Sequence, residues 1–322
     1  MKLSLCINNF NEEKNIRIPL DSAVYFVDEV IIVDGSSKDK TVEIAKSYGA
    51  KVKIFVVDNP RNFLTNKQRA IEKASGEWIL QLDSDEALSE DLKREIATLL
   101  NCYIAKKQPN NVTMKPRHDG VKQFNNEIVG YYIPRKNFFL TKFLMKGGVY
   151  PDYVLRLYKK ENAKFELKDI HENVKIINSN NQISRNKQIS KFNNQNSNKF
   201  ENSNLDVGNC LDSCDLEIGY LKNPILHYAD PNFSRYLLRW DRYTSFDAEE
   251  LAKSIQYPVF SIQNLLIGIN YFIIKPIHWF LKTYFRHKGF MDGFPGFVFS
   301  LFSSIRFWVI YVKWWTIVNK KN

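Results

Sequence analysis

Cysteine is scarce in this 322-residue sequence, and its four positions follow no metal-ligand or disulfide pattern. Two of them form Cys210-x-x-x-Cys214 in a polar segment, which does not favour a zinc site. We therefore expect reduced thiols, as in a cytoplasmic protein. Only five apolar-leaning residues separate Lys2 from Asn8, too few for a secretory signal peptide, and a cytoplasmic location is expected.

Two phosphate-binding signatures are also missing. The sequence has no G-x-G-x-x-G and no Walker lysine loop, so it indicates neither a dinucleotide fold nor a P-loop enzyme. Long uncharged runs are missing as well. The run between Asp292 and Arg306 has 13 residues, whereas a bilayer-spanning helix needs about 20. A longer run, from Ser254 to Ile274, is interrupted by polar residues. We expect helices that lie in a membrane interface.

Acidic residues are nearly absent from the C-terminal region. From Lys275 to Asn322 there are eight Lys or Arg and one acid, Asp292, so this tail carries +7 of the net charge of +11. Trp and Tyr interleaved with these cations favour an anionic membrane surface over nucleic acid. We expect peripheral attachment to the inner face of the cell membrane and no nucleic-acid partner. The alternative is that these helices pack on the rest of the chain or between copies.

The first hundred residues alternate between strand and helix patterns. Helix is expected to begin near Asn11, with Asn11 as N-cap and Glu12 and Glu13 in the first turn. Short connections between alternating elements predict parallel strands in a doubly wound α/β sheet. The expected strands are residues 3–7, 30–34, 52–57 and 78–82, and the later helices 41–48, 64–74 and 89–100.

Carboxylates follow three of these four strands, as Asp34, Asp58 and Asp83. In open α/β sheets, ligands bind at the carboxyl ends of the strands. The fourth strand runs into Asp83-Ser84-Asp85, and side chains two residues apart on extended backbone point the same way. Asp83 and Asp85 can therefore converge on Mg²⁺ or Mn²⁺ and leave positions open for diphosphate oxygens. An acidic surface turn is the alternative for the motif taken alone.

These motifs resemble those of family 2 glycosyltransferases with the GT-A fold, a mostly parallel, Rossmann-like sheet flanked by helices. The resemblance rests on Asn11-Glu12-Glu13, residues 32–41, and residues 74–78 leading to Asp83-Ser84-Asp85. It implies a nucleotide-sugar donor and a divalent metal on its diphosphate. By position, it implies donor contacts for Asn11, Glu13, Asp34, Lys67 and Asp83, with Asp34 near the base and Lys67 near the nucleotide or diphosphate. For Lys67 a solvated helix face is the alternative.

The second half resembles the branch that includes the lipopolysaccharide core β-1,4-glucosyltransferases acting on heptose. The matching segments are residues 131–139, 147–158, 170–172, 221–228 and 289–297. The resemblance implies an inverting hexosyltransferase. Its expected donor is a UDP-hexose, and its expected acceptor is a glycan or lipid-linked saccharide of lipopolysaccharide or another surface glycan.

Such chemistry needs one base, because a metal-neutralised diphosphate leaves without a general acid. We expect Asp152 to be that base, with Glu172 as the alternative. For each residue the alternative is a purely structural role. That role is an ion pair with Arg135 or Arg156 for Asp152, and a surface salt bridge for Glu172. The resemblance also makes His227, and similarly His171, a candidate third metal ligand or diphosphate contact, although a lone histidine is more often an ordinary hydrogen-bonded residue.

We expect four regions along the chain. Residues 1–100 form the nucleotide-sugar half, 101–126 a polar insertion, 127–230 the acceptor half, and 231–322 amphipathic C-terminal helices. Residues 178–204 are rich in Asn and poor in large apolar residues, which predicts a disordered loop. Two other functions stay open: a non-catalytic nucleotide- or carbohydrate-binding protein on the same fold, and a membrane-embedded polysaccharide synthase.

Overall fold

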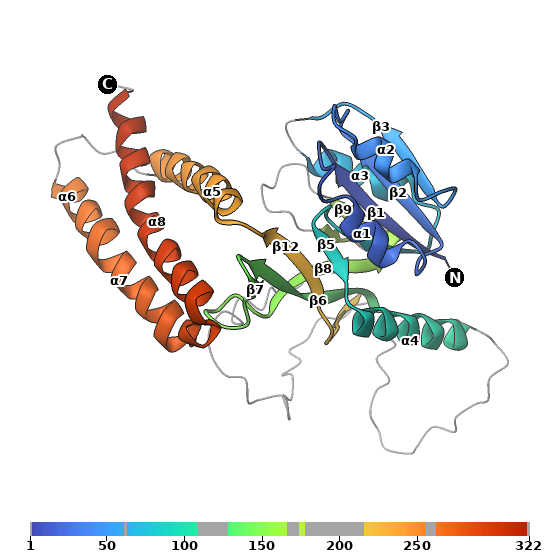
Figure 1. Ribbon diagram of the computed structural model, residues 1–322. Helices are drawn as coiled ribbons and strands as arrows, with labels where there is room; N and C mark the ends of the chain where they lie inside the picture. The colour runs from blue at the N-terminus through green and yellow to red at the C-terminus, as the bar shows by residue number, and fades with distance from the viewer. Residues whose placement is uncertain are drawn as a thin grey trace, which may run out of the picture. The chain divides into compact units, whose positions relative to one another are not determined.

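The computed structural model describes residues 2–60, 63–107, 128–165, 174–177, 216–254 and 262–320. The chain forms two compact units that interleave along the sequence (Figure 1). Unit 1 comprises residues 1–84, 95–132 and 155–221, and unit 2 comprises 85–94, 133–154 and 222–322. The four consecutive regions expected from the sequence differ from this division. Helix α4 (Glu90–Lys107) continues into the expected polar insertion, while residues 108–126 and 178–204 lie outside the described residues.

Unit 1 is built on a parallel sheet. β1 (Leu3–Asn9) pairs in parallel with both β2 (Glu29–Asp34) and β4 (Trp78–Gln81), and β2 pairs in parallel with β3 (Val52–Val56). All six residues of β2 are buried, as expected of a strand covered on both faces. The predicted α/β class is therefore confirmed.

Helices and shorter strands complete unit 1. One face of the sheet is covered by α3 (Leu64–Lys73), whose Leu64 and Ile71 pack in a cluster with Ile31 of β2. The other elements are α1 (Arg17–Ala23), α2 (Thr41–Lys46), η1 (Lys160–Asn162), β9 (Ala163–Phe165), β10 (Val174–Ile176) and β11 (Glu217–Tyr220). Two long strands, β6 (Ile128–Phe139) and β8 (Asp152–Lys159), contribute residues to both units. Within unit 1, β8 pairs antiparallel with β4 and β11 pairs in parallel with β6.

The helix expected from Asn11 is displaced, because α1 begins only at Arg17. Asn11 has a left-handed backbone, with φ of 55°, and its side-chain oxygen accepts a hydrogen bond from Lys38 N at 2.8 Å. Glu13 Oε2 likewise accepts from Lys40 N at 3.1 Å. The amide and carboxylate that were expected to begin a helix instead hold the loop after β2.

Unit 2 contains a smaller set of strands. β12 (Ile225–Asp230) pairs antiparallel with β5 (Glu86–Leu88) and in parallel with the last residues of β6, which also pairs with β7 (Lys142–Phe143). One cluster joins the end of β6 to helices α5 (Phe233–Ser254) and α8 (Gly293–Lys320), and a second cluster joins the two helices to each other. Phe139 and Tyr236 pack with Val298, and Ala248 packs with Ile310 and Trp314. Aromatic and aliphatic side chains therefore hold α5 and α8 together and pack them on the end of β6.

The rest of unit 2 is helical. α6 (Ile262–Ile269), the π-helical turns η2 (Asn270–Ile274), α7 (Lys275–Phe280) and the π-helical turns η3 (Leu281–Arg286) follow one another, and η4 (Gly289–Asp292) leads into α8. In the described part of the chain, residues 289–320 form one helical stretch long and apolar enough to cross a membrane, by length and composition alone. Two cations, Arg306 and Lys313, lie within this helical stretch, and Arg306 ends the uncharged run that begins after Asp292. Lys313 Nζ is bound by Asp241 Oδ1 of α5 at 2.6 Å.

Candidate active site

Asp34 lies at the end of β2 and uses its carboxylate inside the protein. Its Oδ2 accepts hydrogen bonds from Asn9 Nδ2 and Ser37 Oγ, both at 2.6 Å, and its Oδ1 accepts from Ser37 N at 2.7 Å. The side chain is fully buried. Asp34 therefore fixes the start of the loop after β2, and Asn11 and Glu13 bind the backbone of the same loop at Lys38 and Lys40. The donor contacts expected of these three residues stay predictions.

Asp83 follows β4 and is held by two cations of unit 1. Lys67 Nζ of α3 donates to Oδ1 at 2.7 Å, and Arg156 Nη2 of β8 donates to Oδ2 at 2.5 Å. Burial alone would raise the pKa of Asp83, but Arg156 and Lys67 outweigh it and hold the pKa well below its usual range. Because Lys67 is buried, the solvated helix face considered for it is wrong. Arg156 pairs here with Asp83.

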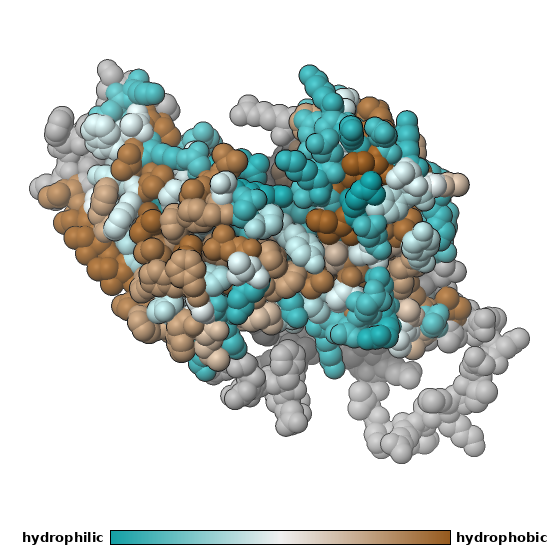
Figure 2. Space-filling view, viewed as in Figure 1, coloured by the Kyte–Doolittle hydropathy of each residue, from teal (hydrophilic) through white to brown (hydrophobic). Residues whose placement is uncertain are grey.

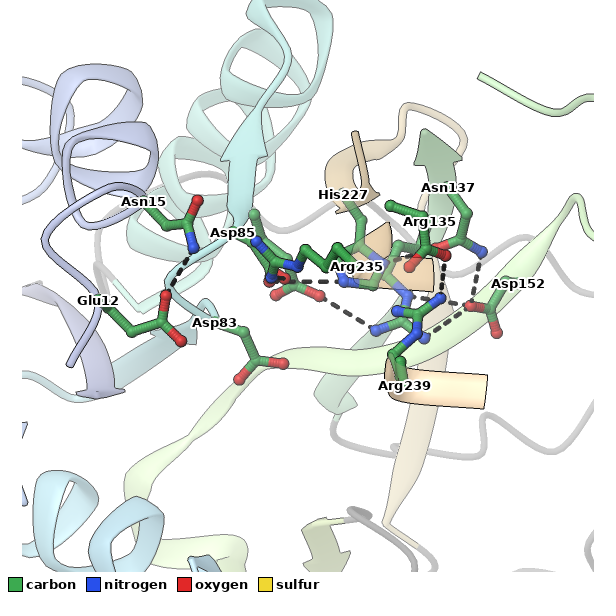
Figure 3. Close-up of polar contacts among 12 residues, drawn as sticks. Glu12, Asn15, Asp83, Asp85, Arg135, Asn137, Asp152, His227, Arg235 and Arg239 are labelled. Carbon is green, nitrogen blue, oxygen red and sulfur yellow. Dashed lines mark hydrogen bonds and ion pairs between the residues drawn. The ribbon is translucent and has the colours of Figure 1, made fainter. Parts of the chain in front are cut away.

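Asp85 belongs to unit 2, where β5 and β12 meet. Its backbone oxygen accepts a hydrogen bond from Tyr228 N at 2.8 Å, which fixes the loop beside β12. Arg235 Nη2, from the first turn of α5, donates to Asp85 Oδ2 at 2.9 Å. The other oxygen, Oδ1, lies 3.5 Å from Nε2 of His227 (Figure 3). The structure thus brings together Asp85 and His227, two residues that the sequence predicts as metal ligands.

His227 is oriented by Asn137 of β6, its neighbour across the strand pair. His227 Nδ1 lies 2.6 Å from Asn137 Oδ1, and Asn137 Nδ2 donates to Asp152 Oδ2 at 3.3 Å. An amide oxygen only accepts hydrogen bonds, so Nδ1 carries the proton in this pairing. In the tautomer that this contact selects, the lone pair is on Nε2, the nitrogen that lies 3.5 Å from Asp85 Oδ1.

Asp152, at the start of β8, has two differently placed oxygens. Arg135 donates to its Oδ2 from Nε at 2.9 Å and from Nη2 at 2.7 Å. Among the described residues, Oδ1 of Asp152 has no hydrogen-bond or ion-pair partner, and the side chain is 35% exposed. Arg135 Nη1 also reaches the fully buried Glu86, at 3.2 Å from Oε1. The ion pair with Arg135 that the sequence allowed is present, and it leaves one carboxylate oxygen available.

Other predicted residues have a different outcome. His171 and Glu172 lie outside the described residues. No group of three or more His, Cys, Asp or Glu placed to hold a metal occurs in the described ranges. Sequence reasoning also missed the polar partners Glu86, Asn137 and Arg235. The four-residue spacing of Arg235 and Arg239 at the start of α5 is the one local signal, and Arg239 binds the buried Asp230.

Comparison with known proteins agrees with the motifs. Residues 4–163 match the family model described as Glycosyl transferase family 2. An uncharacterized glycosyltransferase of Rickettsia bellii (strain RML369-C) is 27% identical over 309 residues, covering 95% of this chain and 84% of the relative. The lipopolysaccharide core biosynthesis glycosyltransferase LpsC of Rhizobium meliloti (strain 1021) is 22% identical, covering 86% and 78%. The crystal structure of S. aureus TarS 1-349 is 13% identical and covers 100% of this chain and 91% of that one, at a TM-score of 0.37, a likeness too slight to carry an argument.

Proposed function

The chain belongs to glycosyl transferase family 2, and from that premise we propose that it is a metal-dependent, inverting hexosyltransferase that uses a UDP-hexose. One observation carries this proposal: Asp85, His227, Asn137 and Asp152 form a continuous polar network in unit 2. The network contains two groups suited to a divalent cation and one carboxylate suited to proton transfer.

The residues around Asp85 fit a divalent cation. Asp85 Oδ1 and His227 Nε2 lie 3.5 Å apart, close enough for both to hold one ion. Asn137 fixes the imidazole with its lone pair on that side, as groups hydrogen-bonded to metal ligands commonly do. Arg235, paired with Asp85, shows that the position already suits a positive charge. When bound, the cation supplies neutralisation of the charge that develops on the departing diphosphate.

Asp152 is suited to take the proton from the acceptor hydroxyl. Arg135 and Asn137 fix Oδ2, so Oδ1 is presented in a constant orientation. As Oδ1 receives the proton, the acceptor oxygen bonds to the anomeric carbon and the bond from that carbon to the diphosphate oxygen breaks. Attack opposite the leaving group inverts the configuration. Glu172 stays the alternative base.

Unit 1 is proposed to hold the nucleotide and diphosphate. Lys67 and Arg156 place two buried cations at the end of β4, where an anionic diphosphate would be attracted. Both oxygens of Asp83 are paired with these cations, so direct coordination of a metal by Asp83 would require at least one pair to open. Asn11, Glu13 and Asp34 are proposed to line the donor side through the loop that they hold.

The proposed acceptor is a saccharide of lipopolysaccharide or another surface glycan, presented on a lipid. The name of the LpsC relative supports this acceptor class. The +7 charge of the C-terminal tail supports a cytoplasmic position on the inner face of the membrane.

Removal of the Asp85 carboxylate tests the proposed chemistry. Asp85→Ala should abolish transfer from UDP-hexose, because the cation loses a charged ligand, while circular dichroism stays unchanged. Asp91→Ala is a matched control, since Asp91 lies in the first turn of α4 and its side chain is 64% exposed. Full transfer in EDTA, or a wild-type rate for Asp85→Ala, would refute the proposal.

A further inference from the structure

The C-terminal helices of unit 2 leave a row of large apolar side chains uncovered. Residues 262–286 form one continuous rod made of α6, η2, α7 and η3. One side of the rod packs on α8, where the rings of Tyr271 and Phe307 lie 6.1 Å apart and Trp308 Nε1 donates to Phe272 O. Six residues spaced four apart are 41–65% exposed and form the apolar row: Leu265, Ile269, Ile273, Ile277, Leu281 and Phe285. Figure 2 shows hydrophobic side chains gathered along these helices.

The two π-helical segments explain why this row stays on one side of the rod. In an α-helix, residues four apart advance about 40° beyond a full turn, so the five steps from Leu265 to Phe285 would carry the row to the opposite side. Hydrogen bonds from i to i+5 put more residues into each π turn and reduce that advance. The π turns at 270–274 and 281–286 thus keep a four-residue repeat on one exposed face.

The charge of the rod indicates what covers the row. Between residues 262 and 288 the sequence contains no Asp or Glu, and its cations are Lys275, Lys282, Arg286 and Lys288. Lys275 Nζ lies 3.6 Å from the ring centroid of Tyr271, and Lys282 Nζ lies 4.9 Å from that of Trp279. A second copy of the rod would bring like charges together. An anionic lipid leaflet supplies both hydrocarbon and negative charge.

We propose that this rod lies in the headgroup–acyl boundary of an anionic bilayer with the apolar row toward the hydrocarbon. The proposal rests on the membrane association proposed above and assigns it to one element. It also separates the rod from α8. In α8, the cation Lys313 is turned toward the protein, where it is bound by Asp241, Thr244 and Ser245 of α5.

Flotation of the full chain with phosphatidylcholine vesicles, with and without phosphatidylglycerol, tests this assignment. The wild type should float with the anionic vesicles. Ile273→Glu/Ile277→Glu should lower partitioning by about a hundredfold or more, because charges replace two exposed isoleucines that would enter the hydrocarbon. Two exposed valines give matched controls that should float: Val56→Glu in β3, 59% exposed, and Val312→Glu in α8, 51% exposed. Leu281→Glu serves if the double variant fails to fold.

Each other outcome would overturn the assignment. Undiminished flotation of the folded double variant would show that the row does not face lipid, and loss with Val312→Glu alone would move attachment to α8. Equal flotation with neutral vesicles would refute selection of anionic lipid. Loss of a dimer with unchanged flotation, seen by sedimentation, would make the row an interface between copies. UDP binding in solution, measured on the same proteins, separates these results from a failure of the proposed enzyme activity.

Discussion

At the scale of single residues, the asymmetry of the Asp152 carboxylate gives a direct test of the base. Asp152→Asn keeps the shape of the side chain and removes its basicity. Turnover should fall by at least about 10², as is typical for loss of a general base, while the dissociation constant for the donor stays unchanged. Glu172→Gln is the matched comparison. If it shows this pattern and Asp152→Asn does not, the base is Glu172.

Asn137 links the proposed metal ligand to the proposed base. Asn137→Ala removes the acceptor for His227 Nδ1 and one donor to Asp152 Oδ2. Loss of such a supporting group should weaken Mn²⁺ binding by about tenfold or more, measured by calorimetry with UDP present. Asn319→Ala, at the end of α8, is the control with the same change. Wild-type Mn²⁺ affinity in Asn137→Ala would show that Asn137 does not support the ligand.

Part of the candidate site could be proposed from the sequence at this scale. Asp83 and Asp85 are visible because a carboxylate pair after an apolar strand is a local pattern. Asn137 is not visible in the same way, because the register of β6 against the distant β12 places it opposite His227. Arg135 is not visible either, because its partners Glu86 and Asp152 come from two other strands. The environment of Lys67 was also open in the sequence, because its position on a helix allowed a solvated face. The structure shows it buried and paired with Asp83.

At the scale of elements, Glu29 joins the starts of β1 and β2 to the turn before β4. Its Oε1 accepts hydrogen bonds from Ser4 Oγ at 2.7 Å and from Ser75 N at 2.6 Å, and Lys53 Nζ lies 2.9 Å from Oε2. Burial alone would raise the pKa of Glu29, but the hydrogen bonds from Ser4 and Ser75 and the nearby Lys53 outweigh it. The pKa therefore lies well below its ordinary value of 4.5.

This lowered pKa predicts acid sensitivity. Because the folded pKa is below the unfolded one, the stabilisation from Glu29 is fully present above about pH 4.5 and is lost as the pH falls toward the folded pKa. Glu29→Gln should reduce the free energy of unfolding at neutral pH by about 2–4 kcal/mol. The difference from wild type should shrink in acid, as measured by urea titration. Glu43→Gln, on the exposed side of α2, should show neither effect. A difference that is constant with pH would contradict this.

Gly296 sets how closely η4 approaches α8. A Cβ added at Gly296 would lie 2.1 Å from the backbone oxygen of Gly289, so the two segments would have to separate. Gly296→Ala should lower the free energy of unfolding by about 1–3 kcal/mol or more through overpacking. At Gly268 an added Cβ would meet the flexible end of Tyr311 at 3.2 Å, so Gly268→Ala is the milder control. Equal stability of the two variants in thermal melts would refute this role.

The first hundred residues show how far local patterns reach. Their four strands and the helices α2 and α3 match the expected ranges closely, because apolar periodicity and a helix-ending Gly49 are local signals. Helix α4 ends at Lys107 rather than at the expected Leu100. The start of α1 was misplaced because Asn11 and Glu13 bind a loop distant in sequence. β5, only Glu86–Leu88, was missed because its pairing with β12 has no local signature.

At the scale of the whole molecule, sequence order and compact units differ. Two long strands, β6 and β8, enter both units, so consecutive regions cannot coincide with contact-based units. The C-terminal charge was visible in the sequence. The proposal that the rod rather than α8 contacts lipid could not be made from the sequence. It depends on the binding of Lys313 to α5 and on the two π-helical segments.

The most direct test of metal-dependent nucleotide-sugar chemistry is calorimetric titration of UDP into the full-length protein. With Mn²⁺ we predict saturable binding, lost in EDTA and strongly weakened in both Asp85→Ala and His227→Ala. The Asp91→Ala control should bind like wild type. Equal UDP affinity with Mn²⁺ and EDTA, or no UDP binding by the wild type with Mn²⁺, would contradict the account.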